Sequence, residues 1–310
     1  MHSKKVIIYL KNRSDTIHIE PLGDIHVGHV GFDKKHYLER VRAIAREENR
    51  YTLFMGDQLD AINIYDKRFN PNAVVLHDID SQRQQWHTLT KELIDVQLAL
   101  CEDKEISQYE YNPTTNKMVE SKIPIKVVKG GENPKILGLL HGNHEYKIRE
   151  LTEIYLKNNF CHNNGIDFLG AKAYISLDIR YNEKRSKGKK WDTKDDEILG
   201  QWSIMAMHGS GGGQPETMLK QMKMNNYCDI FFCGHLHQKY YKEETVKDVD
   251  HDLGKVWDRP IYLANTGTFC EFMTEGVSGY GDTKNQVIGT PIGTATISIN
   301  AESGKVNGHI

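Results

Sequence analysis

The chain has 310 residues, enough for one large domain or two small ones. Its composition, 38 % hydrophobic and 26 % charged, is ordinary for a globular protein and permits a sizeable core. The net charge of -2 excludes the overall basic excess that advertises nucleic-acid binding, although bound metal ions would add local positive charge that this count omits.

Short apolar runs predict strands, and apolar residues recurring every three or four positions predict helices. Asp33 is placed to cap a helix, Ser81 with Gln84 forms a capping box, and Pro215 suits a first helical turn. In chain order, we expect strands at 6–10 and 17–23, a helix at 33–48, a strand at 51–55, a helix from 81 to about 100, a strand at 136–140, a helix at 145–157, strands at 173–179 and 202–207, a helix from 215, and strands at 229–233, 261–264 and 294–299. Alternating strands and helices predict a layered α/β fold.

Three stretches resemble insertions on that core. Residues 61–135 hold the long helix and a polar hairpin-like region around Asn112. Residues 181–200 and 239–259 are charged and are expected to be solvated hairpin loops. We therefore expect a single domain, 1–310, with a helical insertion at about 61–135. Side chains in that insertion are candidates for substrate contact, although a solvated or packed face is the simpler interpretation: Lys67, Arg68, Arg83, Trp86 and His87.

The cysteines and the N-terminus indicate a compartment. Five cysteines, an odd number without a C-x-x-C pair, argue against a secreted disulfide framework and for reduced thiols. The chain runs from Met1 into a strand-like segment without a signal-peptide pattern, and no apolar run approaches membrane-spanning length. We expect a cytoplasmic protein with no membrane partner.

Five predicted strands end in an oxygen or imidazole group next to a glycine. Ligands collect beyond the carboxyl ends of strands in open α/β sheets, and each motif follows an apolar run. In chain order, the motifs are Gly23-Asp24-Ile25-His26, Gly56-Asp57-Gln58-Leu59-Asp60, Gly142-Asn143-His144-Glu145, His208-Gly209 and Gly234-His235-Leu236-His237. Each motif is weak alone, because such short patterns arise by chance. Their joint occurrence in this order is specific.

This ordered set resembles the calcineurin-like metallophosphoesterase superfamily, which includes purple acid phosphatases, cyclic-nucleotide phosphodiesterases and double-strand-break repair nucleases. The resemblance implies two mixed β-sheets packed face to face and flanked by helices, a four-layer sandwich. It also implies a ligand set for two metal ions, one held by Asp24, His26 and His237, the other by Asn143, His208 and His235, with Asp57 bridging both.

The chemistry of these side chains agrees with that implication. Imidazole together with carboxylate suits two divalent transition-metal ions, with Mn²⁺ first and Fe, Zn, Ni or Co as alternatives. Two such ions with two aspartates and one bridging hydroxide leave a net positive cavity, which attracts a phosphate ester. The resemblance implies that His144 faces the leaving oxygen as a general acid or a charge stabiliser; a supporting hydrogen-bond role is the alternative.

Further residues are candidates to orient the ligands, with a purely structural role at least as good an explanation: His29, Asp60, Glu145 and Asp229. The segment 265–268 resembles the one that follows Gly-His-x-His in the family and supports the site. The glycine-rich stretch 209–213 lacks the lysine and the spacing of a phosphate-binding P-loop, so we expect a loop over the metals.

The sequence therefore predicts a metal-dependent phosphoesterase, foremost a phosphodiesterase acting on a nucleotide or nucleic-acid ester through a metal-bridging hydroxide. The alternatives are a phosphomonoesterase, such as a protein phosphatase or nucleotidase, and a non-catalytic metal-binding module. A nuclease acting on DNA would need a basic surface, and the one dense basic run, at 184–190, is offset by the aspartates that follow. The natural substrate and the oligomeric state are left open.

Overall fold

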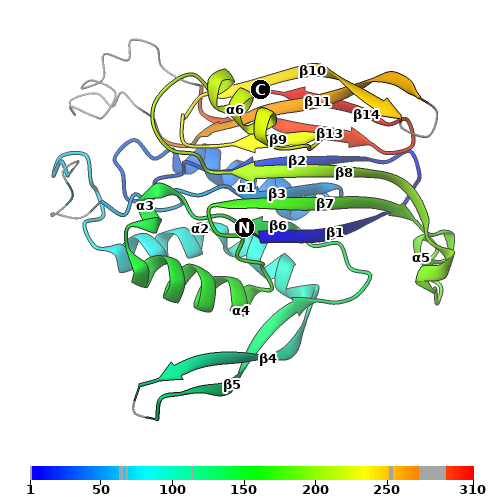
Figure 1. Cartoon of the computed structure of the whole chain (residues 1–310). Helices are drawn as coiled ribbons and strands as arrows, with labels where there is room; N and C mark the ends of the chain where they lie inside the picture. The colour runs from blue at the N-terminus through cyan, green and yellow to red at the C-terminus, as the bar shows by residue number, and fades with distance from the viewer. Residues whose placement is uncertain (1, 63–65, 67–68, 114, 251–253, 272–290) are drawn as a thin grey trace.

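Two mixed β-sheets form the centre of the molecule (Figure 1). The computed structural model describes residues 2–62, 66, 69–113, 115–250, 254–271 and 291–310. The larger sheet has the order β1 (His2–Leu10), β7 (Lys172–Tyr181), β8 (Glu197–Met207), β9 (Ile230–Cys233), β11 (Lys255–Thr268) and β10 (Lys239–Asp250), with β12 (Gly293–Thr294) paired to β11. The smaller sheet has the order β14 (Lys305–His309), β13 (Thr296–Asn300), β2 (Thr16–Leu22), β3 (Arg50–Phe54) and β6 (Ile136–Leu139).

Apolar side chains fill the space between the two sheets. Ile8 and Ile175 from the larger sheet join Ile19, Leu53 and Ile297 from the smaller one in a single buried cluster. Each of these side chains is at most 1 % exposed, so this layer is a dry core of the kind that stabilises packed sheets. On β13, Ser298 lies on the opposite face from Ile297 and is also buried, because it contacts His18 of β2.

Helices cover the outer faces of both sheets and complete four layers. On the smaller sheet, α1 (Lys34–Arg46) and α2 (Ile79–Ala99) bury Tyr37 and Trp86 in a second cluster. On the larger sheet, α6 (Pro215–Asn225) buries Leu219 and Met222 in a third. The predicted fold class, two packed mixed sheets flanked by helices, is confirmed.

The caps of the helices follow local chemistry, with one correction. Asp33 caps α1 as predicted, since its Oδ1 accepts from the backbone N–H of His36 at 3.0 Å. The capping box at Ser81 was wrong: α2 begins at Ile79, and Asp78 caps it by accepting from the Ser81 backbone N–H at 2.7 Å. The earlier start is favoured because Ile79 then packs against the second cluster.

The helix predicted at 145–157 is interrupted. A short α3 (Asn143–Tyr146) comes first, and a π-helical segment, η1 (Glu150–Cys161), continues into α4 (His162–Asn164). Leu151 is buried on the predicted face. Glu145 lies in α3, and its side chain is hydrogen-bonded to the neighbouring loops.

The three predicted insertions contain regular structure. Within 61–135, α2 is followed by the hairpin of β4 (Cys101–Asn112) and β5 (Lys117–Val128), which projects from the body (Figure 1). The segment 181–200 is not a bare loop, because it holds α5 (Glu183–Ser186) and η2 (Thr193–Asp195). Most of 239–259 forms the β10–β11 hairpin. In the part of the chain that is described, no helix is both long and apolar enough to cross a membrane.

The loops that carry the motifs converge because of how the strands run. In the smaller sheet, β2, β3 and β6 are parallel, and in the larger sheet β8, β9 and β11 are parallel. Backbone hydrogen bonds join the loops that follow them: Asp24 N–H donates to Gly56 O at 3.0 Å, and Gly234 N–H donates to His208 O at 3.1 Å. Phe269 N–H then links β11 to Asp24 O at 3.0 Å, which ties one sheet to the other.

Candidate metal centre

All seven predicted ligands lie at this junction, in loops that follow five strands. Asp24 and His26 follow β2, and Asp57 follows β3. Asn143 opens α3 after β6, His208 follows β8, and His235 and His237 follow β9.

Six of these ligands, together with His144, form three groups, each with all its ligand atoms within 4.8 Å of one another, and Asn143 adjoins them through its Oδ1, 3.2 Å from His208 Nε2. The groups are Asp24 with His26 and His237, His26 with Asp57 and His144, and Asp57 with His208 and His235. Asp57 and His26 each belong to two of the groups. The His144 imidazole lies beside the ligands, with Nε2 4.0 Å from Asp57 Oδ2.

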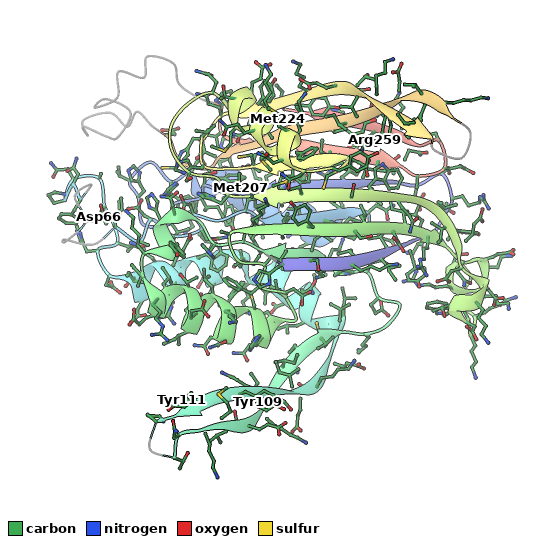
Figure 2. All side chains as sticks on the ribbon, in the orientation of Figure 1. Asp66, Tyr109, Tyr111, Met207, Met224 and Arg259 are labelled. Atoms are coloured by element: carbon green, nitrogen blue, oxygen red, sulfur yellow. The ribbon has the colours of Figure 1, made fainter. Side chains whose placement is uncertain are left out.

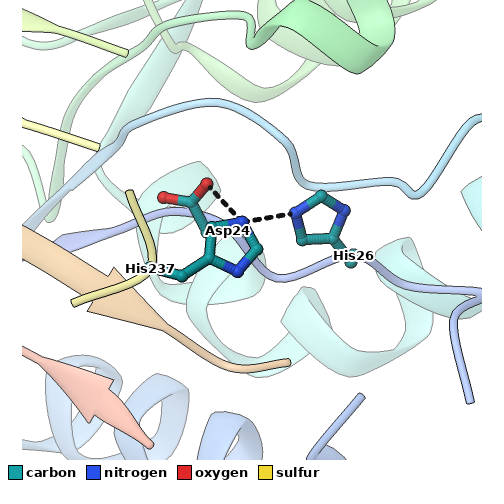
Figure 3. Close-up of side chains that lie close together, drawn as sticks. All are labelled: Asp24, His26 and His237. Atoms are coloured by element: carbon teal, nitrogen blue, oxygen red, sulfur yellow. Dashed lines mark hydrogen bonds and ion pairs between the residues drawn. The ribbon is translucent and has the colours of Figure 1, made fainter. Parts of the chain in front are cut away.

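The first group is compact and largely buried (Figure 3). His237 Nε2 lies 3.2 Å from Asp24 Oδ1 and 3.1 Å from His26 Nε2. At that separation only one proton fits between the two imidazole nitrogens, so one of them donates and the other accepts. A cation between them would satisfy both lone pairs and the carboxylate together.

The group of Asp57, His208 and His235 is arranged around His208, which is 2 % exposed. Its Nδ1–H donates to the backbone carbonyl of Met55 at 2.8 Å, which directs Nε2 toward Asp57 Oδ2 at 3.0 Å and Asn143 Oδ1 at 3.2 Å. Burial opposes a charge on this ring, but Asp57 outweighs it and raises the pKa of His208 to about 10. A proton therefore competes with a cation for Nε2.

His235 completes this group through its other ring nitrogen. Its Nε2–H donates to the carbonyl of Gly211 in the glycine-rich stretch at 2.8 Å. Its Nδ1 is buried and has no hydrogen-bond partner. A buried polar atom without a partner is costly, and a cation at this imidazole would satisfy it.

The backbone at the centre is strained. Among the described residues, positive φ occurs at seven that are not glycine, and five of these are predicted ligands: Asp24 (49°), His26 (51°), Asp57 (51°), His235 (69°) and His237 (55°). Such conformations cost about 1–3 kcal/mol each for residues with a Cβ and concentrate at functional sites. Packing and hydrogen bonds must therefore hold these side chains in place against local preference.

Glycines allow the loops to approach one another. Gly56 has φ of +96°, and a Cβ there would lie 2.6 Å from Gly142 N and 2.7 Å from His208 Nδ1. Gly142 has an ordinary φ, but a Cβ on it would collide with the Asp57 carboxylate. The first glycine permits a turn, and the second permits close contact between the loops.

Glu145 fastens two of the ligand-bearing loops together. Its Oε2 accepts from Asp57 N–H at 3.0 Å and Gly142 N–H at 2.9 Å, and its Oε1 accepts from Leu59 N–H at 3.1 Å. Burial, together with the Asp57 charge, raises the pKa of Glu145 to about 8. The predicted orienting role is thus matched by direct contacts with the backbone of Asp57.

Asp60 and Thr268 orient the imidazoles. Asp60 Oδ1 lies 3.4 Å from His26 Nδ1, and the Asp60 carbonyl accepts from His144 Nδ1–H. The Thr268 hydroxyl donates to Asp24 O at 2.8 Å and lies 3.2 Å from His237 Nδ1, which can donate to it. Both contacts leave Nε2 of the rings directed at the centre.

Other candidates lie elsewhere. The His29 ring contacts the Cys270 sulfur at 3.2 Å, and Cys270 is not a predicted ligand. Asp229 binds Ser203 and Arg259, which is a structural role. In the insertion, Trp86 is fully buried, and Lys67 and Arg68 lie outside the described residues. The carbonyls of Met55 and Gly211 were not foreseen, because a backbone acceptor has no sequence signal.

The charges of the centre suit a divalent cation. Burial raises the pKa of Asp57 and of Asp24, but neighbouring histidines outweigh burial and hold both carboxyl pKa values below the usual range. The main histidine neighbour is His208 for Asp57 and His237 for Asp24. Burial above all lowers the pKa of His26 well below its ordinary value. Anionic carboxylates facing this neutral imidazole form the protonation state that binds metal.

Comparisons with known proteins add little to this geometry. No family model matches the chain, and no curated protein matches it. Among solved structures, one that is similar is a crystal structure of a single mutant of Vps29 from Entamoeba histolytica, 11 % identical, covering 94 % of this chain and 97 % of that one with a TM-score of 0.32. At those values the likeness does not bear on the site.

Proposed function

We propose that this chain is a member of the calcineurin-like metallophosphoesterase superfamily and a phosphodiesterase that acts on a nucleotide or nucleic-acid ester with two divalent transition-metal ions. The observation that carries the proposal is the convergence of six predicted ligands and His144 from five loops, with the Asp57 carboxylate grouped with His26 on one side and with His208 and His235 on the other. Five of the predicted ligands have strained backbone conformations, and such strain is concentrated at functional sites.

The residues divide into two ligand sets. Asp24, His26 and His237 would hold one ion, and Asn143, His208 and His235 the other, with Asp57 reaching both. When bound, such a pair of ions supplies Lewis acidity and an activated water for in-line displacement at phosphorus. Imidazole and carboxylate ligands favour manganese, iron or zinc over magnesium or calcium.

His144 is the proton-bearing group of the proposal. Its Nδ1–H is held by the Asp60 carbonyl, so Nε2 is the atom that faces the centre, 4.0 Å from Asp57 Oδ2. There it can donate a proton to the leaving oxygen of a diester, whose alkoxide is a poor leaving group. An ester with an alkoxide leaving group gains more from that proton than one with an acidic leaving group, such as 4-nitrophenolate, does.

The test is hydrolysis by the full chain with manganese. We expect turnover of bis-(4-nitrophenyl) phosphate that exceeds turnover of 4-nitrophenyl phosphate. Asp57→Asn should abolish it, whereas Asp103→Asn, the same change on the exposed hairpin, should not. A preference for the monoester would make the chain a phosphomonoesterase, and metal uptake without hydrolysis of either would make it a binding module.

A further inference from the structure

Three aromatic rings form a stack next to the candidate metal centre. The His141 ring is stacked with Tyr146, at a centroid separation of 5.2 Å and 12° between the planes, and with Phe168, at 5.9 Å and 23°. His141 is 8 % exposed, whereas Tyr146 is 69 % exposed. One face of the tyrosine ring is therefore backed by the stack while most of the residue is open to solvent.

The stack rests on the same framework as the ligands. His141 N–H donates to Gly170 O at 3.0 Å, and Phe168 pairs with Leu139 at the end of β6. Tyr146 N–H donates to Gly142 O at 3.1 Å, which closes the turn of α3. The tyrosine is thus held on a rigid element instead of a loop.

The position of Tyr146 brings it close to the centre. Asn143 and Tyr146 are three residues apart in α3, so their side chains lie on one face of the turn, with Cβ atoms about 5–6 Å apart. Asn143 Oδ1 faces His208 Nε2 at 3.2 Å.

We propose that Tyr146, backed by His141, is a stacking platform for the nucleobase of a nucleotide ester whose phosphate lies at the metal centre. The proposal rests on the proposed function, which it narrows to substrates that carry a base. An exposed aromatic face is what a base stacks on, and such stacking tolerates any base because each has a flat π-surface.

Single exposed aromatic residues are common on protein surfaces and need no explanation. Among the described residues, Tyr109, Tyr111, Tyr227 and Trp257 are also exposed. Tyr146 differs from Tyr109 and Tyr111 by its place, since those two lie on the projecting hairpin (Figure 2). Tyr109, 60 % exposed, is therefore a matched control.

The experiment is calorimetric binding of two phosphonates to the full chain with manganese present. One ligand is thymidine 5′-methylenephosphonate, and the other is the same sugar phosphonate without its base. Their carbon–phosphorus bond is not cleaved by phosphoester hydrolysis, so binding is measured without turnover. For the wild type we expect the base to tighten binding about tenfold, or about 1.4 kcal/mol, at the low end of base–aromatic stacking.

The variants isolate the ring. Tyr146→Leu keeps an apolar contact with His141 but has no flat face, so the base should tighten binding by no more than about twofold. Tyr146→Phe and Tyr109→Ala should keep the tenfold ratio. Equal affinities in the wild type, no binding of either ligand, or an undiminished ratio in Tyr146→Leu would overturn the platform.

The outcome is separable from that of the proposed function. A chain that prefers the base-bearing phosphonate through Tyr146 but hydrolyses no ester would retain the platform and lose the esterase proposal. A chain that hydrolyses diesters but binds both phosphonates equally well would keep the esterase proposal and lose the platform.

Discussion

Replacing Thr268 by valine tests whether the residues around the ligands hold them in position. Thr268 is fully buried, and valine has the same shape without the hydroxyl. The hydroxyl has four contacts that valine would lose: Asp24 O at 2.8 Å, His237 Nδ1 at 3.2 Å, Cys270 N–H at 3.0 Å and Cys270 O at 3.4 Å.

The expected loss of stability depends on which hydrogen bonds the partners of the Thr268 hydroxyl keep in the valine variant. The Asp24 carbonyl still accepts a hydrogen bond from Phe269 N–H at 3.0 Å, so it keeps a partner in the variant. The Cys270 N–H loses its hydroxyl acceptor in a buried place, which costs about 1–3 kcal/mol. We expect Thr268→Val to lower the free energy of unfolding by about 2 kcal/mol and, because His237 is no longer oriented, to weaken manganese binding about 10–100-fold.

The assay is urea denaturation for stability and titration calorimetry for manganese affinity. Thr268→Ser, which keeps the hydroxyl, should restore most of the metal affinity. Thr90→Val is the control: it removes an equally buried hydroxyl, bonded to Trp86 O at 2.6 Å within α2, and should leave metal affinity unchanged. Wild-type affinity in Thr268→Val, or an equal loss in Thr90→Val, would refute the orienting role.

Other predictions concern catalysis, a buried lysine and a helix cap. His144→Ala should slow diester turnover about 10²–10⁴-fold while keeping the wild-type metal content by elemental analysis; loss of an ion would instead make His144 a ligand. Lys135→Met should cost about 2 kcal/mol in urea denaturation, because Lys135 Nζ donates to the carbonyls of Glu47, Glu48 and Arg50 beyond the end of α1. Burial lowers the pKa of Lys135 from 10.5 to about 8. Between those values the unfolded chain binds the extra proton, so wild-type stability should rise with pH relative to Lys135→Met, and a fall would contradict the assigned shift. Asp78→Ala should cost about 1 kcal/mol, more than Ser81→Ala, and the reverse order would return the cap of α2 to Ser81.

Much of the arrangement was predictable because its signals are local. Apolar runs located the strands, and a glycine beside an oxygen or imidazole group marked the ends at which ligands gather. The four layers follow from the alternation of strands and helices together with the family resemblance. The motifs could be located because each follows a strand end, whereas the division of their side chains into a ligand set came from the family resemblance.

What failed depended on contacts between distant segments. Asp78 and Ser81 are both good caps, and burial of Ile79 against the second cluster decided between them. Asp60 and His29 looked equally suited to orient the ligands, but only the fold brings Asp60 to His26. Neither the break after α3 nor the three N–H groups that hold Glu145 could be read from periodicity.

The most direct test is anomalous diffraction from crystals of the full chain soaked in manganese. We expect two peaks, one among Asp24, His26 and His237 and the other among Asn143, His208 and His235, with Asp57 between them. A single peak, no peak, or peaks away from these side chains would contradict a two-ion centre.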